Sequence, residues 1–152
     1  MNTTIIIHEE DPGTEDATVL MDELSDSLQR VTGRSGRASF DPDDVRAPRS
    51  LFVIARDGNG QALGCGAFRP MDEHTAEVKR MYARMSGKGT GGLILSHLEK
   101  RARDFGYASL KLETGLVNQQ AVDFYEGRGY KRIPNYGKYV DYPDSVCFEK
   151  IL

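Results

Sequence analysis

Apolar side chains recur at helical spacing in three stretches of the chain. In the first stretch they lie three, four, seven, eleven and fourteen positions after the first of them, at Ala17, Leu20, Met21, Leu24, Leu28 and Val31. This spacing puts them on one face of an amphipathic helix. Thr14 precedes the stretch as a candidate N-cap, and Gly33 follows it as a stop. The pattern therefore predicts a helix between these two residues.

Two further helices are expected in the second half of the chain. One begins directly after a glycine-rich stretch and ends near Gly106, with an apolar face made of Ile94, Leu95, Leu98, Ala102 and Phe105. The other lies in NQQAVDFYEGRG, which opens at Asn118 and closes with Gly127 and Gly129. Each has an apolar face that must be buried against another element.

Short apolar runs with strand character separate these helices. They are TTIIIHEE, LFVIAR, QALGCGAFRP, TAEVKRMYA, SLKLET, YKRI and SVCFEKIL, and the turn DGNG joins the second and third as a hairpin. The alternation breaks at Lys79 and Arg80, which predicts a β-bulge. The order predicts an α+β fold with one mixed, mostly antiparallel sheet of six to seven strands, flanked by helices. TAEVKRMYA and SLKLET are expected to run parallel.

Length and composition indicate one globular domain over residues 1–152, with 39% hydrophobic and 28% charged residues. A net charge of −3 argues against a nucleic-acid partner. No apolar run is long enough to span a bilayer, and MNTTIIIHEE lacks the pattern of a secretory leader, so we expect a cytoplasmic protein with no membrane partner. Cys65 and Cys147 lie in strand-like runs without metal-ligand spacing. We expect both to be core residues and expect no metal site.

The stretch SGKGTGG, residues 86–92, places four glycines directly before the second helix. A strand, a glycine-rich turn and a helix N-terminus together present backbone N–H groups at the positive end of a helix dipole, which favours a bound phosphate or pyrophosphate. Tight packing is the alternative explanation of the glycines. The P-loop pattern does not match, and GxGxxG matches from Gly87 to Gly92 without the successive parallel strand-helix units that it needs.

Residues 77–133 resemble the core of the GNAT superfamily of acetyl-coenzyme A dependent N-acetyltransferases. That family carries Q/R-x-x-G-x-G/A after its fourth strand, and later an Asn and a helix that ends in FYxxxGY. Here Gly89 and Gly91 match the two glycines, with Ser86 in the Gln/Arg position; we prefer this register to one two residues earlier, which would use Arg84, Gly87 and Gly89. Asn118 and FYEGRGY match the later part. The resemblance implies one GNAT-like domain.

Acetyl-CoA is the co-substrate that the resemblance implies, with no metal. It implies that the pantetheine arm lies along Met81, Tyr82 and Ala83, between splayed fourth and fifth strands. The residues implied for the pyrophosphate are Gly87, Lys88, Gly89, Thr90, Gly91 and Gly92. Lys88 is equally well explained as a solvated loop charge. Asn118 can cap its helix, bind the pantetheine, or do both.

Proton-transfer roles also follow from the resemblance. Tyr125 matches the tyrosine near the sulfur and is the candidate general acid, with packing as the alternative role. Glu77 is the candidate base, directly or through a water, and its alternative is a salt bridge with Lys79 or a nearby arginine. Glu113 is the second candidate base. The N–H of Tyr82 or of a neighbour is the expected oxyanion donor.

The expected acceptor is a primary amine of a small molecule or of a polypeptide. We expect its pocket to lie between the first helix and the loops 33–49 and 134–144. The second loop offers Tyr136, Tyr139 and Tyr142 to shape the pocket, and the first offers Arg37, Arg46 and Arg49 to bind an anionic group. A function of a different class is a CoA-binding regulatory or interaction module. The resemblance also allows a homodimer.

Overall fold

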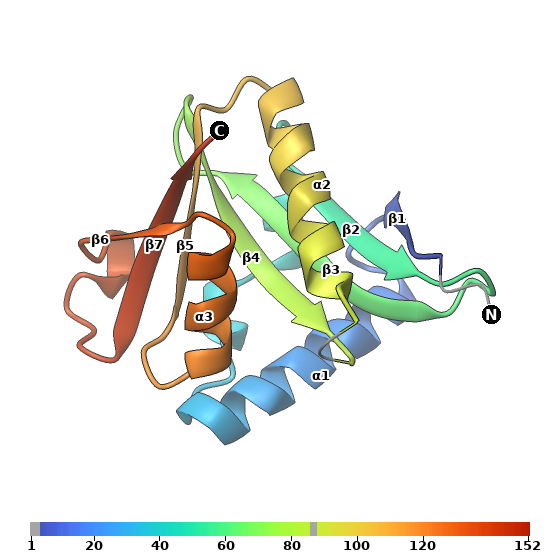
Figure 1. The fold of residues 1–152 in the computed structure, drawn as a ribbon, viewed down its shortest axis with the longest axis horizontal. Helices are drawn as coiled ribbons and strands as arrows, with labels where there is room; N and C mark the ends of the chain where they lie inside the picture. The colour runs from blue at the N-terminus through green and yellow to red at the C-terminus, as the bar shows by residue number, and fades with distance from the viewer. Residues whose placement is uncertain (1–3, 86–87) are drawn as a thin grey trace.

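The computed structural model describes residues 4–85 and 88–152. Its strands form one seven-stranded sheet in the order β1-β2-β3-β4-β5-β7-β6 (Figure 1). They are β1 (Ile6–Glu9), β2 (Leu51–Arg56), β3 (Ala62–Pro70), β4 (Thr75–Ala83), β5 (Ser109–Gly115), β6 (Lys131–Ile133) and β7 (Ser145–Ile151). The β4–β5 pair is parallel and the other neighbouring pairs are antiparallel. This confirms the predicted α+β class and the mixed, mostly antiparallel sheet.

The α-helices of the described residues are α1 (Glu15–Thr32), α2 (Thr90–Asp104) and α3 (Gln119–Gly127). The predicted ends of α1 are confirmed: Thr14 Oγ1 accepts a hydrogen bond from the Ala17 amide at 3.2 Å, and Gly33 adopts a left-handed φ of 80°. The loop 33–49 contains two short 3₁₀ turns, Arg37–Ser39 and Pro42–Val45.

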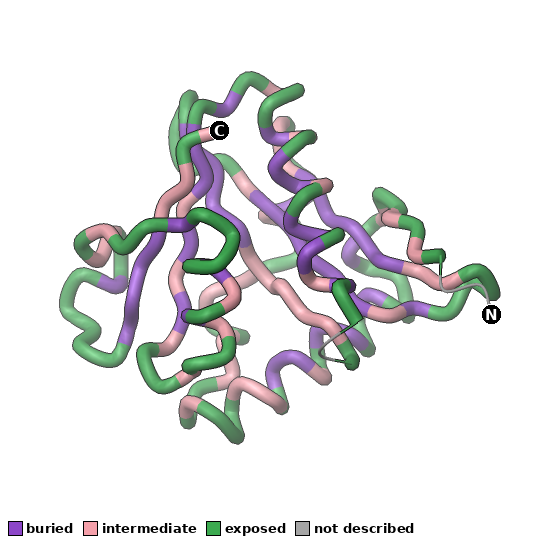
Figure 2. Tube along the Cα trace, viewed as in Figure 1, coloured by how far each residue is buried: buried purple, intermediate pink, exposed green. Residues whose placement is uncertain are grey.

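Apolar clusters cover both faces of the sheet. One joins α2 and α3 to the sheet and includes Val53 and Ala55, whereas the other joins α1 to the sheet and includes Phe52 and Ile54. Successive residues of β2 therefore point to opposite clusters, which explains why this strand is a continuous apolar run. Figure 1 shows α2 and α3 in front of the sheet, and Figure 2 shows the central strands buried between the layers.

β4 and β5 separate after a short parallel ladder. The ladder runs from Thr75↔Ser109 to Glu77↔Lys111, while β4 continues to Ala83. The first four residues of β4 are buried and the last five are half-buried (Figure 2). Because no strand of the described residues pairs with this second half on the β5 side, its backbone is available to another extended chain.

The predicted bulge is confirmed at the same place. Pairing with β3 shifts register between Cys65 and Ala67, so that β4 has one extra residue between Lys79 and Tyr82. Arg80 takes a φ of 55°, a left-handed backbone conformation that residues other than glycine rarely adopt. The bulge turns the side chains of both Lys79 and Arg80 toward the α1 side of the sheet, where each has its hydrogen-bond partners.

Both cysteines are free and buried, as expected. Burial raises the pKa of the Cys65 thiol to about 12, so this sulfur stays protonated at neutral pH. No group of three His, Cys, Asp or Glu side chains within residues 4–85 and 88–152 is arranged to hold a metal ion. In the same residues, no helix has the length and apolar character needed to cross a membrane.

Candidate functional site

The start of α2 lies against α3. A Cβ placed on Gly91 would stand 3.4 Å from Cζ of Phe124, and one placed on Gly92 would collide with the guanidinium of Arg128. Arg128 also lies 5.5 Å from the centre of the Phe124 ring. Gly92 therefore leaves the space that the Arg128 guanidinium occupies, which brings a cation to the first turn of α2.

The N-terminus of α2 has the features of an anion site. Gly89 is the N-cap with a φ of 79°, and no side chain of residues 4–85 and 88–152 caps this end. The first bond within the helix runs from the Leu93 amide to the Gly89 carbonyl at 3.1 Å, so the amides of Thr90, Gly91 and Gly92 precede it. These amides suit a phosphate oxygen. Lys88 and Gly89 are exposed. The predicted contact of Gly87, like the position of Ser86, falls outside the described residues.

Tyr125 is buried in α3, with only 7% of its surface exposed. Its ring packs against Phe124, Tyr130 and Phe148, with centroid distances of 5.1, 5.7 and 6.4 Å. No hydrogen bond among the described residues involves its hydroxyl, and burial alone raises the pKa of that hydroxyl. The residue thus fills the predicted packing role while its O–H group remains available.

Asn118 caps α3, as the sequence suggested. Its side-chain oxygen accepts a hydrogen bond from the Ala121 amide at 3.4 Å. Tyr82 lies at the end of β4, and its hydroxyl donates to Glu23 of α1 at 3.0 Å. The Tyr82 side chain is therefore engaged on the α1 face, and its backbone belongs to the part of β4 that β5 does not pair.

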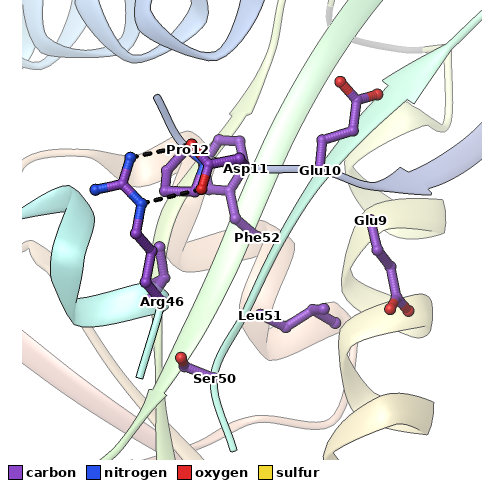
Figure 3. Close-up of a pocket in the computed structure, with 9 residues that line it drawn as sticks. Glu9, Glu10, Asp11, Pro12, Arg46, Ser50, Leu51 and Phe52 are labelled. Carbon is purple, nitrogen blue, oxygen red and sulfur yellow. Dashed lines mark hydrogen bonds and ion pairs between the residues drawn. The ribbon is translucent and has the colours of Figure 1, made fainter. Parts of the chain in front are cut away.

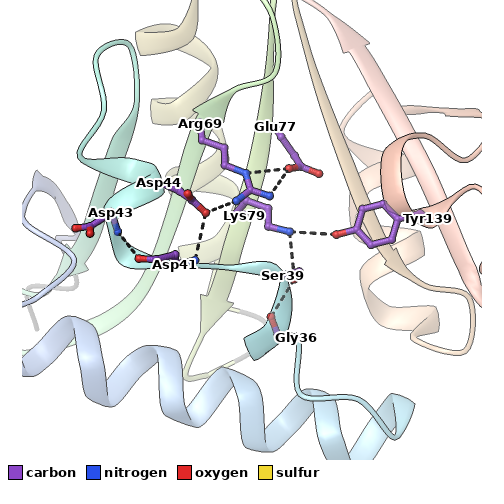
Figure 4. Close-up of polar contacts among 9 residues, drawn as sticks. All are labelled: Gly36, Ser39, Asp41, Asp43, Asp44, Arg69, Glu77, Lys79 and Tyr139. Carbon is purple, nitrogen blue, oxygen red and sulfur yellow. Dashed lines mark hydrogen bonds and ion pairs between the residues drawn. The ribbon is translucent and has the colours of Figure 1, made fainter.

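Glu77 sits in an ionic cluster on the same face of β4, beside the loop 33–49 (Figure 4). It is 5% exposed and forms an ion pair with Arg69, whose Nη2 lies 3.0 Å from its Oε1. Arg69 also pairs with Asp44, and Tyr136 donates its hydroxyl to Glu77 Oε2 at 2.6 Å. Both oxygens of Glu77 are thus occupied. The structure therefore shows the alternative role of Glu77, a salt bridge with a nearby arginine.

Lys79 and Glu113 lie beside this cluster. Lys79 Nζ donates to Ser39 Oγ at 3.3 Å and to the Tyr139 hydroxyl at 3.2 Å (Figure 4). Burial lowers the pKa of Lys79 from 10.5 to about 8, against the opposing charge of Glu77. Glu113 accepts a hydrogen bond from Ser145 Oγ at 2.6 Å, and burial raises its pKa. The pKa of each of these two groups is shifted toward neutral pH, as is typical of groups that exchange protons there.

The shifted pKa of Lys79 gives a testable dependence of stability on pH. Because the folded pKa is lowered, the unfolded chain binds more protons than the folded chain between about pH 8 and pH 10, so the free energy of unfolding rises with pH there. In Lys79→Met this rise, at most about 1.4 kcal/mol per pH unit, should disappear. Urea unfolding of both proteins across this range measures it. Parallel curves for the two proteins would show that Lys79 has an ordinary pKa.

Two cavities lie away from the glycine stretch. The larger, about 520 Å³, is lined by the end of β1, the start of β2 and Arg46 (Figure 3). Its carboxylates already have cationic partners: Glu9 pairs with Arg101, Glu10 with Arg56 and Asp11 with Arg46. It contains none of the predicted cofactor or catalytic residues. We therefore assign it no chemistry.

The smaller cavity, about 330 Å³, lies between α1 and the loop 33–49. These are two of the three walls expected for the acceptor pocket. The third, the loop 134–144, instead contacts Glu77 and Lys79 through Tyr136 and Tyr139. Tyr142 packs beside Tyr139, with ring centroids 6.1 Å apart.

The three loop arginines differ from expectation because each has protein partners. Arg37 pairs with Asp22, and Arg46 pairs with Asp11. Arg49 donates to the carbonyls of Phe105 and Glu73 and stacks 4.0 Å from the Tyr107 ring. Arg49 therefore ties the loop to the end of α2.

Sequence reasoning missed Arg69 and Arg128. Arg69 stands directly opposite Glu77 in the β3–β4 ladder, so the hairpin register between two recognised strands contained this pairing. Arg128 follows Phe124 by four positions, and residues four apart on a helix lie on the same side. Both residues could be recognised from their positions, Arg69 in a strand pair and Arg128 at the end of a helix, but no sequence motif marks either of them.

Comparison with known proteins agrees with this arrangement. The model of the acetyltransferase (GNAT) family matches residues 17–130. The "IAA acetyltransferase" of Azospirillum brasilense is 29% identical over 151 residues, which are 97% of this chain and 98% of that protein. A Klebsiella pneumoniae structure described as an acyl-CoA N-acyltransferase has a TM-score of 0.82 and 28% identity, with 99% of each chain covered.

A third protein, a GNAT family acetyltransferase from Elizabethkingia anophelis, was solved with acetyl-CoA bound to it. Its TM-score is 0.71 at 18% identity, with 97% of this chain and 98% of that chain covered, which shows a shared fold. The family match covers three quarters of the 152 residues, in the segment that holds the bulge, the start of α2 and Tyr125. The chain belongs to the acetyltransferase (GNAT) family.

Proposed function

We propose that this protein transfers an acetyl group from acetyl-CoA to a primary amine of a small molecule, with a polypeptide amine as the less favoured acceptor. The observation that carries the proposal is the separation of β4 from β5 after Glu77, next to an α2 N-terminus that no described side chain caps. An extended arm that ends in a pyrophosphate fits this combination of a free strand edge and an anion site. The Klebsiella protein's description as an N-acyltransferase supports an amine acceptor.

Residues of three elements would hold acetyl-CoA. The backbone of Met81, Tyr82 and Ala83 would bind the pantetheine arm, and the amides of Thr90 to Gly92 would bind the pyrophosphate. Arg128 stands at the first turn of α2 and would add a positive charge there. When bound, acetyl-CoA supplies a thioester whose carbonyl carbon the amine attacks.

The protein's own groups would manage the protons. An amine attacks only in its neutral form, so a base must take a proton from it. The contacts favour Glu113 over Glu77, because Glu77 is held by Arg69 and Tyr136 while burial raises the pKa of Glu113 toward neutrality. The free hydroxyl of Tyr125 would donate a proton to the departing thiolate, and the Tyr82 amide would stabilise the oxyanion.

A panel assay tests the proposal. Release of the CoA thiol from acetyl-CoA should depend on an added amine, and calorimetry should show binding of both acetyl-CoA and CoA. Binding without amine-dependent release would favour the alternative, a CoA-binding regulatory or interaction module. Absence of any binding would reject both functions.

A further inference from the structure

Arg80 is the bulge residue of β4, and its guanidinium is fixed beneath α1. Its Nη2 donates to the Met21 carbonyl at 2.8 Å and to the Ser25 hydroxyl. The left-handed φ of 55° directs this side chain to the α1 side of the sheet. The protein therefore holds the cation in place at some conformational cost.

No carboxylate of the described residues forms an ion pair with this cation, although the charge of Asp22 acts on it from farther away. Among the described residues, no Asp or Glu oxygen lies within 4.0 Å of Arg80. Its Nε is buried without a hydrogen-bond partner, and its Nη1 takes part in no hydrogen bond of the described residues. Desolvating a charge without a counter-ion is unfavourable, so an anion from outside the chain would complete the site.

The side chain of Arg80 lines the cavity of about 330 Å³ between α1 and the loop 33–49. Met21, Phe40 and Pro42 supply apolar walls, and the Phe40 ring centre lies 5.8 Å from the Arg80 guanidinium carbon. The other two arginines of the cavity already have carboxylates, Asp22 at 3.3 Å from Arg37 and Asp11 at 2.9 Å from Arg46. Arg80 is thus the cation in this cavity that lacks one.

We propose that this cavity binds the carboxylate of an acceptor that also has an apolar body, with Arg80 as the carboxylate-binding residue. The statement that the bound carboxylate belongs to the acceptor rests on the proposed acetyl transfer. One guanidinium without a paired carboxylate matches the single charge of a carboxylate better than a phosphate dianion. Arg80 directly precedes Met81, so a bound carboxylate would place the rest of the acceptor next to the β4 segment proposed for pantetheine.

The binding test uses hydrocinnamate, which is phenylalanine without its amine, and needs no acetyl transfer. In ¹⁵N NMR of the full chain, hydrocinnamate should shift the Arg80 Nε–H signal in a saturable way, and inorganic phosphate should not. Arg80→Gln should weaken hydrocinnamate binding by about 10- to 100-fold, the loss of a charge-assisted hydrogen bond. Arg46→Gln, in the same cavity but at a paired arginine, should change it by less than about threefold.

Equal weakening by both variants, a stronger response to phosphate, or no shift would overturn the proposal. If Arg80→Gln does not fold, Arg80→Lys keeps the charge but loses the guanidinium, and it should still weaken binding by about tenfold. The wild-type titration stands independently of either variant.

The kinetic test compares phenylalanine with phenethylamine, which lacks the carboxylate. Wild-type kcat/KM should favour phenylalanine, and Arg80→Gln should reduce that preference by about 10- to 100-fold, mostly through KM. Acetylation of both amines without preference would overturn the carboxylate site. An NMR shift without acetylation of any amine would support the site and reject the proposed function.

Discussion

Tyr125→Phe should lower kcat by about 100-fold and leave the affinity for acetyl-CoA within about threefold. The substitution removes one hydroxyl that has no hydrogen-bond partner among the described residues, so it should disturb the packing little. If that hydroxyl protonates the departing thiolate, its loss affects the chemical step and not cofactor binding. Steady-state kinetics with a good amine, together with calorimetry of acetyl-CoA, measures the two effects separately.

Tyr130→Phe is the matched control. Its ring packs 5.7 Å from that of Tyr125, and its hydroxyl donates to the buried Glu99 at 2.9 Å. The same loss of one hydroxyl should here lower stability by about 1 to 3 kcal/mol and leave turnover nearly unchanged. An unchanged kcat in Tyr125→Phe, or an equal loss in both variants, would refute the general-acid role.

Arg69→Met should destabilise the fold by about 3 to 5 kcal/mol. Glu77 is 5% exposed, and its ion pair with Arg69 provides the counter-charge that makes this burial tolerable. Met has a similar length and no charge, so the variant leaves a buried carboxylate whose remaining hydrogen bond among the described residues comes from the Tyr136 hydroxyl. Urea unfolding at neutral pH measures the loss.

The double variant Arg69→Met with Glu77→Gln separates charge from shape. Removing the second charge should restore a large part of the lost stability, because the cost in the single variant comes from an unpaired anion. Glu77→Gln alone should keep most of the turnover if Glu113 is the base. Loss of turnover in Glu77→Gln greater than in Glu113→Gln would assign the base to Glu77 instead.

Most of the fold was predictable because its elements follow simple periodicities. The spacing of Ala17, Leu20 and Leu24 identified α1, and the break at Lys79 and Arg80 identified the bulge. Thr3 of the run TTIIIHEE lies outside the described residues, and within the described part of this run pairing with β2 covers Ile6 to Glu9, so the strand begins later than Thr4. Local pattern predicts that a strand exists more reliably than it predicts where pairing ends.

The candidate site was less predictable because it depends on contacts between distant segments. Nothing near Glu77 in the sequence shows that Tyr136, 59 positions away, donates to its carboxylate. The partners of Arg37 and Arg46 likewise depend on how the loop 33–49 packs. Arg37 meets Asp22 of α1, and Arg46 meets Asp11 in the segment after β1. Arg80 was recognised only as part of a bulge, since the direction of its side chain depends on the left-handed φ that the bulge imposes.

The central claim is that the protein moves an acetyl group from acetyl-CoA to an amine. Its most direct test is the release of CoA thiol by the wild-type protein across the amine panel, with mass spectrometry of each acceptor. We expect release that requires both protein and amine, with one acetyl group gained by the acceptor for each thiol released. Thiol release that is the same with and without amine, and no acetylated acceptor in the panel, would contradict the claim.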